Sequence, residues 1–458
     1  MSSLAEPVKF HRMLSPDRPE ESAGGGIGQG ELGGRPMLFD LLIGGHHVTY
    51  IRHLVDCWDV SRWPNGLDFV VSPLFLERHG DLVRRAREES LNIRFIAISA
   101  SESTALNGSR SELSRLLRMV REWQLMCRYA SRLGASHCLL MYLDSCWLPI
   151  AMGMSAPCPL SGIYFRPALH YSTFANYRPA KNENWQRWRE SFILHRMLRH
   201  PQLHKLLTLD PFAVKPISQR IEQQRSAVKI DYLVDPIQRY SIAGDAAINL
   251  REKLAIASHK KIFLLFGALT SRKGIDQLLA ALRLLSAEQA GQIALVLLGP
   301  GNRPTLSAKV KALKQVQPVQ VIENYDFVAD QVVQIYFEMA DVVLALYQRH
   351  VGMSGILLWA AAAQKPVLST DYGLMGELVN RHSLGLTVDS SCPSAIAEGL
   401  VKYLQDSGSE IGDRTQMKSF ADSHSPNRFA ETIIETICAQ PAGKKMARDH
   451  EFQERIKS

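Results

Sequence analysis

Short apolar segments alternate with helical segments along almost the whole of this 458-residue chain. The strand-like segments fall at 37–43, 68–72, 93–99, 137–143 and 162–165 in the first half, and at 262–266, 293–298, 321–322, 341–346 and 366–369 in the second. Strands that alternate with helices in this way build parallel sheets covered by helices on both faces. We therefore expect an α/β fold of two Rossmann-like domains that face each other across a cleft.

Breaks in this alternation predict the domain boundaries. Residues 1–36 contain seven glycines in a short polar stretch, which predicts a flexible leader. Residues 37–235 are expected to form the N-terminal Rossmann-like domain and residues 236–420 the C-terminal one. Residues 421–458 are expected to form a C-terminal helix, with apolar periodicity from 427 to 438, and a tail.

The clearest helical pattern precedes Gly134, which is expected to end that helix. Its apolar positions recur at the spacing of one helix face: Leu113, Leu116, Leu117, Val120 and Cys127. Such periodicity predicts an amphipathic helix.

One segment, 185–229, supplies most of the net charge of +8, with nine basic residues against three acidic ones. Helical spacing places Trp185, Trp188 and Phe192 near one face. A basic amphipathic segment of this kind can lie on an anionic membrane, and the same pattern also fits a solvated helix that packs its aromatic side chains on the domain core. The basic residues form no recognised reader motif, so no nucleic-acid partner is expected.

Composition and cysteine usage limit the class of protein. Hydrophobic residues make up 46% of the chain and charged residues 21%, which excludes disorder of the whole chain. The seven cysteines are odd in number and form no CxxC pair, so neither a disulfide framework nor a zinc site is expected. A reducing compartment is the default for such a chain.

The longest uncharged stretch, 145–165, does not suit a membrane span. It contains Pro149, Pro157 and Pro159, and prolines disrupt a spanning helix. We expect a loop followed by a strand here. The first residues lack the apolar core of a secretory signal. These features predict a cytoplasmic protein, with peripheral attachment to the inner membrane face as a variant suggested by the basic segment.

A series of glycine-containing motifs runs through the second half in a fixed order. They are found at 266–276 (FGALTSRKGID), 297–301 (LLGPG), 339–344 (MADVVL), 354–356 (SGI) and 365–367 (KPV), followed by Gly373, Gly376, Glu377 and Gly385. In order and spacing they resemble the C-terminal domain of glycosyltransferases of the GT-B fold, specifically the family 4 group of retaining enzymes within glycosyl transferases group 1. The resemblance covers 230–440, whereas 37–230 shares only the α/β pattern and a glycine turn.

This resemblance implies an activity. The chain would be a hexosyltransferase-type glycosyltransferase that moves a sugar from a nucleotide-diphosphate donor to a glycan or lipid-linked acceptor, with retention and without a metal. The N-terminal domain would face the acceptor and the C-terminal domain would bind the nucleotide sugar. No cofactor is expected beyond this substrate, and the products would be precursors of glycolipid or cell-surface polysaccharide.

The residues themselves suggest how the leaving diphosphate is stabilised. Its negative charge must be met as the glycosidic bond breaks, and cationic side chains with a helix N-terminus can meet it. Arg272 and Lys273 follow the first strand of the second domain, at the end where α/β proteins bind ligands. The other candidates for donor binding in this domain are Gly299, Ser354, Gly355, Ile356 and Glu377. For Lys273 the alternative is an exposed lysine at a helix start, and for Glu377 an exposed helix carboxylate.

In the first domain, Gly44, Gly45, His46 and His47 follow the first strand directly. The glycines are candidates for donor binding, and either histidine can bind the acceptor or the reacting sugar, or cap the helix instead. Asp144 ends the strand 137–143 and is expected to point toward the cleft, with a turn cap as the alternative. Arg166 is a similar, weaker case. No Asp-x-Asp pair stands at a strand end, so no metal site is expected.

The chain departs from the family at two positions. The family commonly carries two glutamates eight positions apart, and here Val351 and Trp359 stand in their places. Trp359 is expected to be core or pocket wall, and Arg349, His350 and Ser354 are the polar side chains that can replace the missing contacts. The departure also fits a second function, that of a degenerate GT-B protein acting as a binding or scaffold subunit.

Overall fold

The structure is a computed structural model that describes residues 34–44, 46–106, 111–174, 183–406 and 411–438. Most of the expected leader, Gly45 and the expected tail beyond residue 438 lie outside the described residues. The described chain contains two parallel β-sheets of seven and six strands, which confirms the expected α/β fold.

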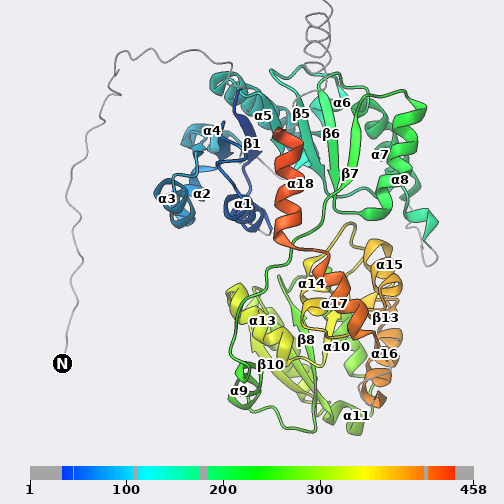
Figure 1. Ribbon diagram of the computed structural model, residues 1–458. Helices are drawn as coiled ribbons and strands as arrows, with labels where there is room; N and C mark the ends of the chain where they lie inside the picture. The colour runs from blue at the N-terminus through cyan, green and yellow to red at the C-terminus, as the bar shows by residue number, and fades with distance from the viewer. Residues whose placement is uncertain (1–33, 45, 107–110, 175–182, 407–410, 439–458) are drawn as a thin grey trace, which may run out of the picture. The chain divides into compact units, whose positions relative to one another are not determined.

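The first sheet has the strand order β3-β2-β1-β4-β5-β6-β7 (Figure 1). Its strands are β1 (Pro36–Asp40), β2 (Leu67–Val71), β3 (Ile93–Ala97), β4 (His137–Leu140), β5 (Leu160–Tyr164), β6 (Leu203–Thr208) and β7 (Lys229–Tyr232). The order reverses between β1 and β4, which pair in parallel with Met37 opposite Cys138. Such a switch point leaves a crevice at the carboxyl ends of the two strands, where α/β proteins bind ligands.

Helices cover both faces of this sheet, and the strands near its centre, β1, β2 and β4, are buried throughout. One face packs against α1 (His47–Asp56), α2 (Pro73–Arg78) and α3 (Gly80–Glu88). The other packs against α4 (Ala100–Leu106), α5 (Glu112–Leu133), α6 (Trp147–Ala151), α7 (Glu183–Met197) and α8 (Pro211–Gln223). Trp123, Met126 and Ala130 provide the inward face of α5.

The second sheet has the order β10-β9-β8-β11-β12-β13, with its own switch point between β8 and β11. Its strands are β8 (Lys261–Phe266), β9 (Ile293–Leu298), β10 (Gln320–Asn324), β11 (Val342–Ala345), β12 (Val367–Thr370) and β13 (Gly385–Val388). The helices around it are α9 (Ala246–Lys253), α10 (Ile275–Leu282), α11 (Ala287–Gly291), α12 (Arg303–Lys314), α13 (Asp330–Met339), α14 (Gly355–Ala362), α15 (Gly373–Arg381), α16 (Pro393–Gln405) and α17 (Arg414–Asp422).

The last described helix, α18 (Pro426–Cys438), returns to the first sheet. Its apolar face packs on α1, and the Phe429 ring lies 4.6 Å from the Tyr50 ring, centre to centre. Tyr50 in turn donates a hydrogen bond to Asp235, which follows β7. The chain therefore contributes to the N-terminal domain at both ends of its sequence.

Three features of the local structure differ from or go beyond what the sequence predicted. The loop expected after residue 145 contains α6, because Pro149 stands in its first turn, where a backbone N–H is not needed. The basic segment 185–229 contains β6 and α8 in addition to the expected helix. Its aromatic side chains do not pack on the core: Trp185, Trp188 and Phe192 are 59%, 62% and 55% exposed.

Of the helices in the described residues, none is long and apolar enough to cross a membrane.

Candidate functional site

Lys273 lies at the carboxyl end of β8, in the short 3-10 turn Ser271–Lys273. Its side chain is buried rather than exposed, with 4% of its surface accessible. The Nζ atom donates a hydrogen bond to the Tyr347 hydroxyl and lies 4.1 Å from the centre of that ring. Burial lowers the pKa of Lys273, while Tyr347 acts in the opposite direction. Among the described residues no carboxylate forms an ion pair with Lys273, so this buried ammonium lacks an anionic partner there.

Two glycines make the room for this lysine. A Cβ on Gly267 would lie 3.0 Å from Lys273 Nζ, and Gly267 has a φ of 107° that favours glycine. Gly299 (φ 120°) ends β9, and a Cβ there would lie 2.6 Å from the Gly267 carbonyl oxygen. Gly299, a predicted donor-binding residue, therefore holds the turn that positions Lys273.

Further basic groups surround Lys273. Arg272 is exposed, and its Nη1 lies 3.5 Å from Nδ1 of His350. Burial, together with the charges of Arg272, Arg166 and Lys273, lowers the pKa of His350 to about 4. Arg166 belongs to the N-terminal domain, so cations of both domains act at the same position. A site surrounded by several positively charged side chains attracts an anion such as a phosphate.

The N-terminus of α14 lies beside these cations. The Tyr347 hydroxyl lies 2.7 Å from Ser354 Oγ, so Ser354 is linked to Lys273 through one tyrosine. Gly355 opens α14, and a Cβ there would lie 3.1 Å from Cε1 of His46. His46 therefore reaches across from the N-terminal domain to this helix end. The Ile356 side chain is buried in the core, which leaves its backbone amide as the part available to a ligand.

In the N-terminal domain, β1 ends at Asp40, which the sequence analysis did not select. The Asp40 carboxylate is buried, and its Oδ2 lies 2.7 Å from Nδ1 of His47. Its Oδ1 accepts a hydrogen bond from the Leu42 amide. His47 is thus oriented by a carboxylate, whereas His46 is exposed. Gly44 is exposed and a Cβ there would contact nothing, so the structure gives no steric reason for a glycine.

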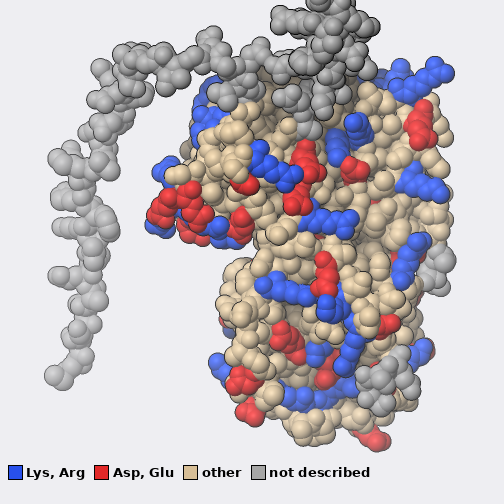
Figure 2. Space-filling view, in the orientation of Figure 1, with Lys and Arg blue, Asp and Glu red and all other residues tan. Residues whose placement is uncertain are grey.

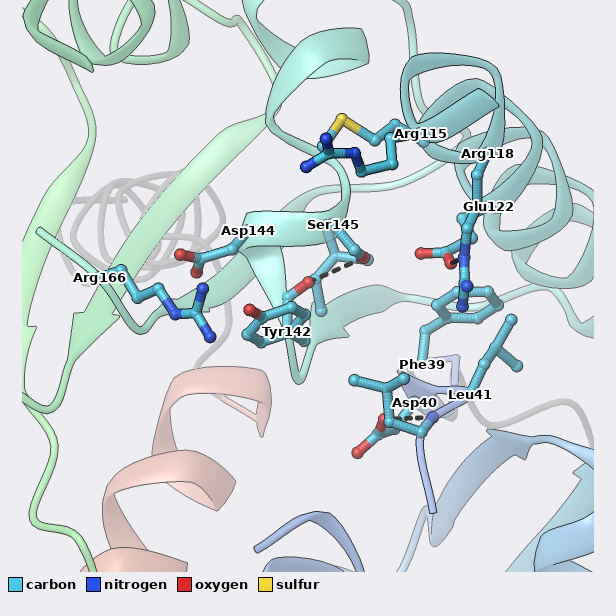
Figure 3. A pocket seen from close by; sticks show the side chains of 13 residues that line it. Phe39, Asp40, Leu41, Arg115, Arg118, Glu122, Tyr142, Asp144, Ser145 and Arg166 are labelled. Carbon is cyan, nitrogen blue, oxygen red and sulfur yellow. Dashed lines mark hydrogen bonds and ion pairs between the residues drawn. The ribbon is translucent and has the colours of Figure 1, made fainter. Parts of the chain in front are cut away.

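A pocket of about 400 Å³ lies at the switch point between β1 and β4 (Figure 3). Its polar lining residues are Asp40, Arg115, Arg118, Glu122, Tyr142, Asp144, Ser145 and Arg166. Arg118 and Glu122 form an ion pair within α5. Figure 3 shows Asp144 and Arg166 on the opposite side of the pocket from this pair.

Asp144 stands in a 3-10 turn (Leu143–Ser145) that follows β4, not in the strand itself. Its Oδ2 accepts a hydrogen bond from the Phe165 amide at 2.8 Å. Burial raises the pKa of Asp144 to about 6, although that bond and Arg166 oppose the change. The Asp144 carboxyl thus bonds to the backbone and also lines the pocket, and its functional role stays a prediction.

Arg166 connects the pocket to the cations around Lys273. Its side chain lines the pocket, and its Cγ lies 4.0 Å from where a Cβ of Gly352 would stand. Gly352 belongs to the segment between β11 and α14 that also carries His350. The structure therefore brings together Lys273, Arg272, Ser354, Gly355 and His46, and places Asp144 and Arg166 beside them.

Tyr171, from the loop after β5, was also missed by the sequence analysis. It is fully buried in the hydrophobic core of the C-terminal domain. Its hydroxyl accepts hydrogen bonds from the Gly352 amide, at 2.9 Å, and from the Leu374 amide. A Cβ on Gly373 would lie 2.6 Å from the Tyr171 ring, so only glycine admits the ring there. Tyr171 therefore joins the two domains next to the site.

Replacing Tyr171 with phenylalanine is expected to lower the free energy of unfolding by about 1–3 kcal/mol, because two buried amides lose their acceptor. Urea denaturation followed by circular dichroism measures this change. Tyr336→Phe is the matched control, since Tyr336 is also buried but its hydroxyl has no hydrogen-bond partner among the described residues. Equal stability of the Tyr171 variant and the wild type would show that these bonds contribute nothing.

Three other positions lie outside this arrangement. Glu377 forms an ion pair with Arg381 one turn later on α15. Trp359 is partly buried against Phe337, with ring centres 5.8 Å apart, as expected for core or pocket wall. Val351 also packs against the core. Among the described residues, no group of three His, Cys, Asp or Glu side chains is placed to hold a metal ion.

Two parallel-sheet domains, each with a switch point in its strand order, form an α/β fold of the GT-B type. Residues 247–424 match the family described as glycosyl transferases group 1, which confirms the resemblance expected for the C-terminal domain. The narrower assignment to the family 4 group stays a prediction. No curated protein matches the sequence significantly.

Solved structures share the fold across nearly the whole chain. HepE of Anabaena, determined in complex with UDP and glucose, is 13% identical, with 89% of this chain and 100% of that chain covered and a TM-score of 0.59. WaaG, a glycosyltransferase involved in lipopolysaccharide biosynthesis, is 16% identical, with 88% and 100% covered and a TM-score of 0.58. Sucrose-phosphate synthase of Thermosynechococcus elongatus is 15% identical, with 88% and 98% covered and a TM-score of 0.61.

Proposed function

We propose that this protein transfers a sugar from a nucleoside-diphosphate donor to a hydroxyl group of a glycan or lipid-linked acceptor. The observation that carries the proposal is the buried Lys273, which has a tyrosine and an arginine beside it but no carboxylate. A buried cation without a counter-ion is costly unless an anionic ligand completes the site. The structure of HepE with UDP and glucose supports the same class of donor.

The donor diphosphate would bind between Lys273, Arg272 and the first amides of α14. Helix N-termini carry unsatisfied N–H groups and a partial positive charge, which suit a phosphate. Ser354 and Gly355 carry these amides and lie close to Tyr347. His46 lies beside the same N-terminus of α14. The two cations supply the charge that the leaving group needs, so we propose transfer without a metal.

The acceptor hydroxyl would bind in the pocket that Asp144 lines. As the acceptor oxygen forms its bond to the anomeric carbon, the bond from that carbon to the diphosphate breaks, and the hydroxyl proton passes to the Asp144 carboxylate. A pKa of about 6 suits a group that accepts a proton near neutral pH. His46 and His47 would orient the sugar or the acceptor, with His47 held in place by Asp40. Retention of configuration, which the family resemblance implies, requires the acceptor oxygen to enter on the same face of the sugar from which the diphosphate leaves.

A second function, a binding or scaffold subunit without turnover, has one observation in its favour. Val351 and Trp359 are apolar side chains packed against the core, where the family commonly has two carboxylates. A protein of this kind could keep the fold and the Lys273 site yet fail to release product. The two functions differ in turnover, not in donor binding.

A thermal-shift screen with UDP-, GDP-, ADP-, CDP- and dTDP-linked sugars tests donor binding. A true donor at about 100 times its dissociation constant adds about 2.7 kcal/mol to stability, which raises the melting temperature by several degrees. We expect one or a few of these compounds to do so. No shift with any of them, in a folded protein, would remove the basis for proposing a transferase.

We also propose that the protein acts at an anionic membrane surface through α7. Trp185, Trp188 and Phe192 form an exposed aromatic face on this helix, and the Arg189 guanidinium lies 5.2 Å from the Trp185 ring centre. Figure 2 shows Lys and Arg side chains gathered over α7 and α8 at the right-hand edge of the view. Tryptophan and arginine side by side are typical of the bilayer interface.

Reversing the charge of Arg187, Arg189, Arg196 and Arg199 to glutamate tests this surface. Each basic residue near an anionic bilayer contributes about 1 kcal/mol, so the variant should lose most of its binding. Co-sedimentation with vesicles containing phosphatidylglycerol measures it, and high salt should have the same effect on the wild type. If the variant sediments with vesicles as well as the wild type does, α7 is not the contact.

A further inference from the structure

Tyr347 stands at the centre of the polar groups around the N-terminus of α14. Its side chain is buried, and its hydroxyl contacts both Lys273 Nζ and Ser354 Oγ. The centre of its ring lies 5.4 Å from the Arg272 guanidinium and 5.0 Å from the centre of the His350 ring. One tyrosine, which sequence reasoning did not select, therefore touches or borders four polar side chains from the loops that follow β8 and β11.

The ionised Lys273 fixes the direction of the hydrogen bonds that pass through this tyrosine. An ammonium group can only donate, so the Tyr347 oxygen accepts the bond from Nζ. The tyrosine proton then needs an acceptor of its own. Ser354 Oγ, 2.7 Å away, is the acceptor that the described residues offer it. The bonds therefore run from Lys273 to Tyr347 and from Tyr347 to Ser354.

This direction leaves the hydroxyl proton of Ser354 without an acceptor in the part of the chain that the structure describes. Ser354 is the N-cap residue of α14, a position where serine commonly accepts a bond from an amide of the first turn, but it makes no such bond here. The residue is only 8% exposed. A buried hydroxyl donor without an acceptor destabilises the site unless a ligand supplies the acceptor.

We propose that Tyr347 is a positioning residue that turns the Ser354 hydroxyl toward the bound anion, so that Ser354 and Lys273 donate to the same phosphate group. Both side chains then present donors only, which selects an oxygen atom without a proton, such as those of a diphosphate. The identity of the anion rests on the proposed function. The inference adds that the bond from Ser354 depends on the charge of Lys273, because a neutral amine can accept from Tyr347 and allow both bonds to reverse.

The arrangement predicts how pH changes the affinity for a diphosphate. Burial lowers the pKa of Lys273, whereas the contact with Tyr347 raises it. The neighbouring basic groups are Arg272, which also lowers this pKa, and His350, whose own pKa Lys273 helps to lower. Loss of the Tyr347 hydroxyl should therefore lower the pKa of Lys273 further. As the pH rises, the affinity of a Tyr347→Phe variant should fall at a lower pH than that of the wild type.

The first test is a double-mutant cycle, measured by isothermal titration of the full chain with UDP, GDP, ADP and inorganic diphosphate. Ser354→Ala should weaken binding about tenfold in the wild type, because a hydrogen bond to a charged group is lost. In the Tyr347→Phe background the same change should weaken binding less than about threefold, since the Ser354 hydroxyl is no longer oriented. Tyr336→Phe is the matched control background, because Tyr336 is buried and its hydroxyl has no hydrogen-bond partner among the described residues. There the effect of Ser354→Ala should again be about tenfold.

A second measurement follows Lys273 without any ligand. Labelling the lysines with ¹³C at Cε reports their ionisation by NMR as the pH is raised, and the Lys273→Met spectrum assigns the signal of Lys273. This signal should titrate at a lower pH in Tyr347→Phe than in the wild type or in Tyr336→Phe. A tyrosine that served only to fill space would leave the titration unchanged.

The outcomes separate this inference from the proposed function. Equal effects of Ser354→Ala in the wild type and in Tyr347→Phe, or an unchanged titration of Lys273, overturn the role of Tyr347 and leave donor binding standing. If Tyr347→Phe does not fold, Ser354→Ala alone decides, because unchanged affinity would show that the Ser354 hydroxyl does not meet the ligand. If the wild type binds none of the four probes, the proposed donor site fails and the role of Ser354 fails with it.

Discussion

Lys273→Met is expected to weaken the binding of a nucleoside diphosphate about 100-fold or more while leaving the protein folded. The ammonium is the buried cation nearest the N-terminus of α14, and a charge-assisted bond to phosphate in such a site contributes several kcal/mol. Methionine fills the space of the lysine chain without the charge, so the packing around Tyr347 should survive. Isothermal titration with UDP, GDP and ADP measures the loss.

Lys311→Met is the control for this substitution. Lys311 is an exposed lysine on α12 of the same domain, so its replacement also removes one positive charge. The affinity of the Lys311→Met variant for nucleoside diphosphates should match that of the wild type. If the Lys273 variant binds nucleoside diphosphates as tightly as the Lys311 variant does, Lys273 is a structural lysine and the donor site lies elsewhere.

Asp144→Asn is expected to lower the rate of sugar transfer by about 10²–10⁴, the usual contribution of a positioned general base. Because the pKa of Asp144 is about 6, wild-type activity should fall as the pH decreases through 6. The activity of the variant should not show this fall. Steady-state rates from pH 5 to pH 8 measure both effects. Asp245→Asn, at an exposed helix start, is the control. An unchanged pH profile in the Asp144 variant would exclude Asp144 from proton transfer.

The same substitution should raise stability at neutral pH. Burial raises the pKa of Asp144 in the folded protein above its value near 4 in an unfolded chain, so the ionised form destabilises the fold. This destabilisation by the ionised Asp144 carboxylate is absent below pH 4, grows between pH 4 and pH 6 and is complete above pH 6. The shift of about two units corresponds to roughly 3 kcal/mol at most. Urea denaturation at pH 5 and pH 8 should show the variant gaining stability mainly at the higher pH.

The repeating pattern of the chain predicted the fold because most strands are short, largely apolar segments that alternate with helices. Lys273 was predicted for the same reason: it follows such a strand at the end where ligands bind. Tyr347 and Tyr171 could not be predicted, because their partners stand 74 and 181 residues away in the sequence. The exposure of Leu113, Leu116 and Leu117 on α5 could not be predicted either, since periodicity shows that a helix has an apolar face but not which face meets the core.

The release of nucleoside diphosphate from a panel of sugar nucleotides, measured in the presence of vesicles made from polar lipid extract, decides whether this protein transfers sugar. We predict that one donor class is turned over, that Lys273→Met abolishes the release and that Asp144→Asn slows it. A donor that stabilises the wild type in the thermal-shift screen but is never turned over would contradict the transferase account. That result would instead identify the chain as a GT-B binding subunit.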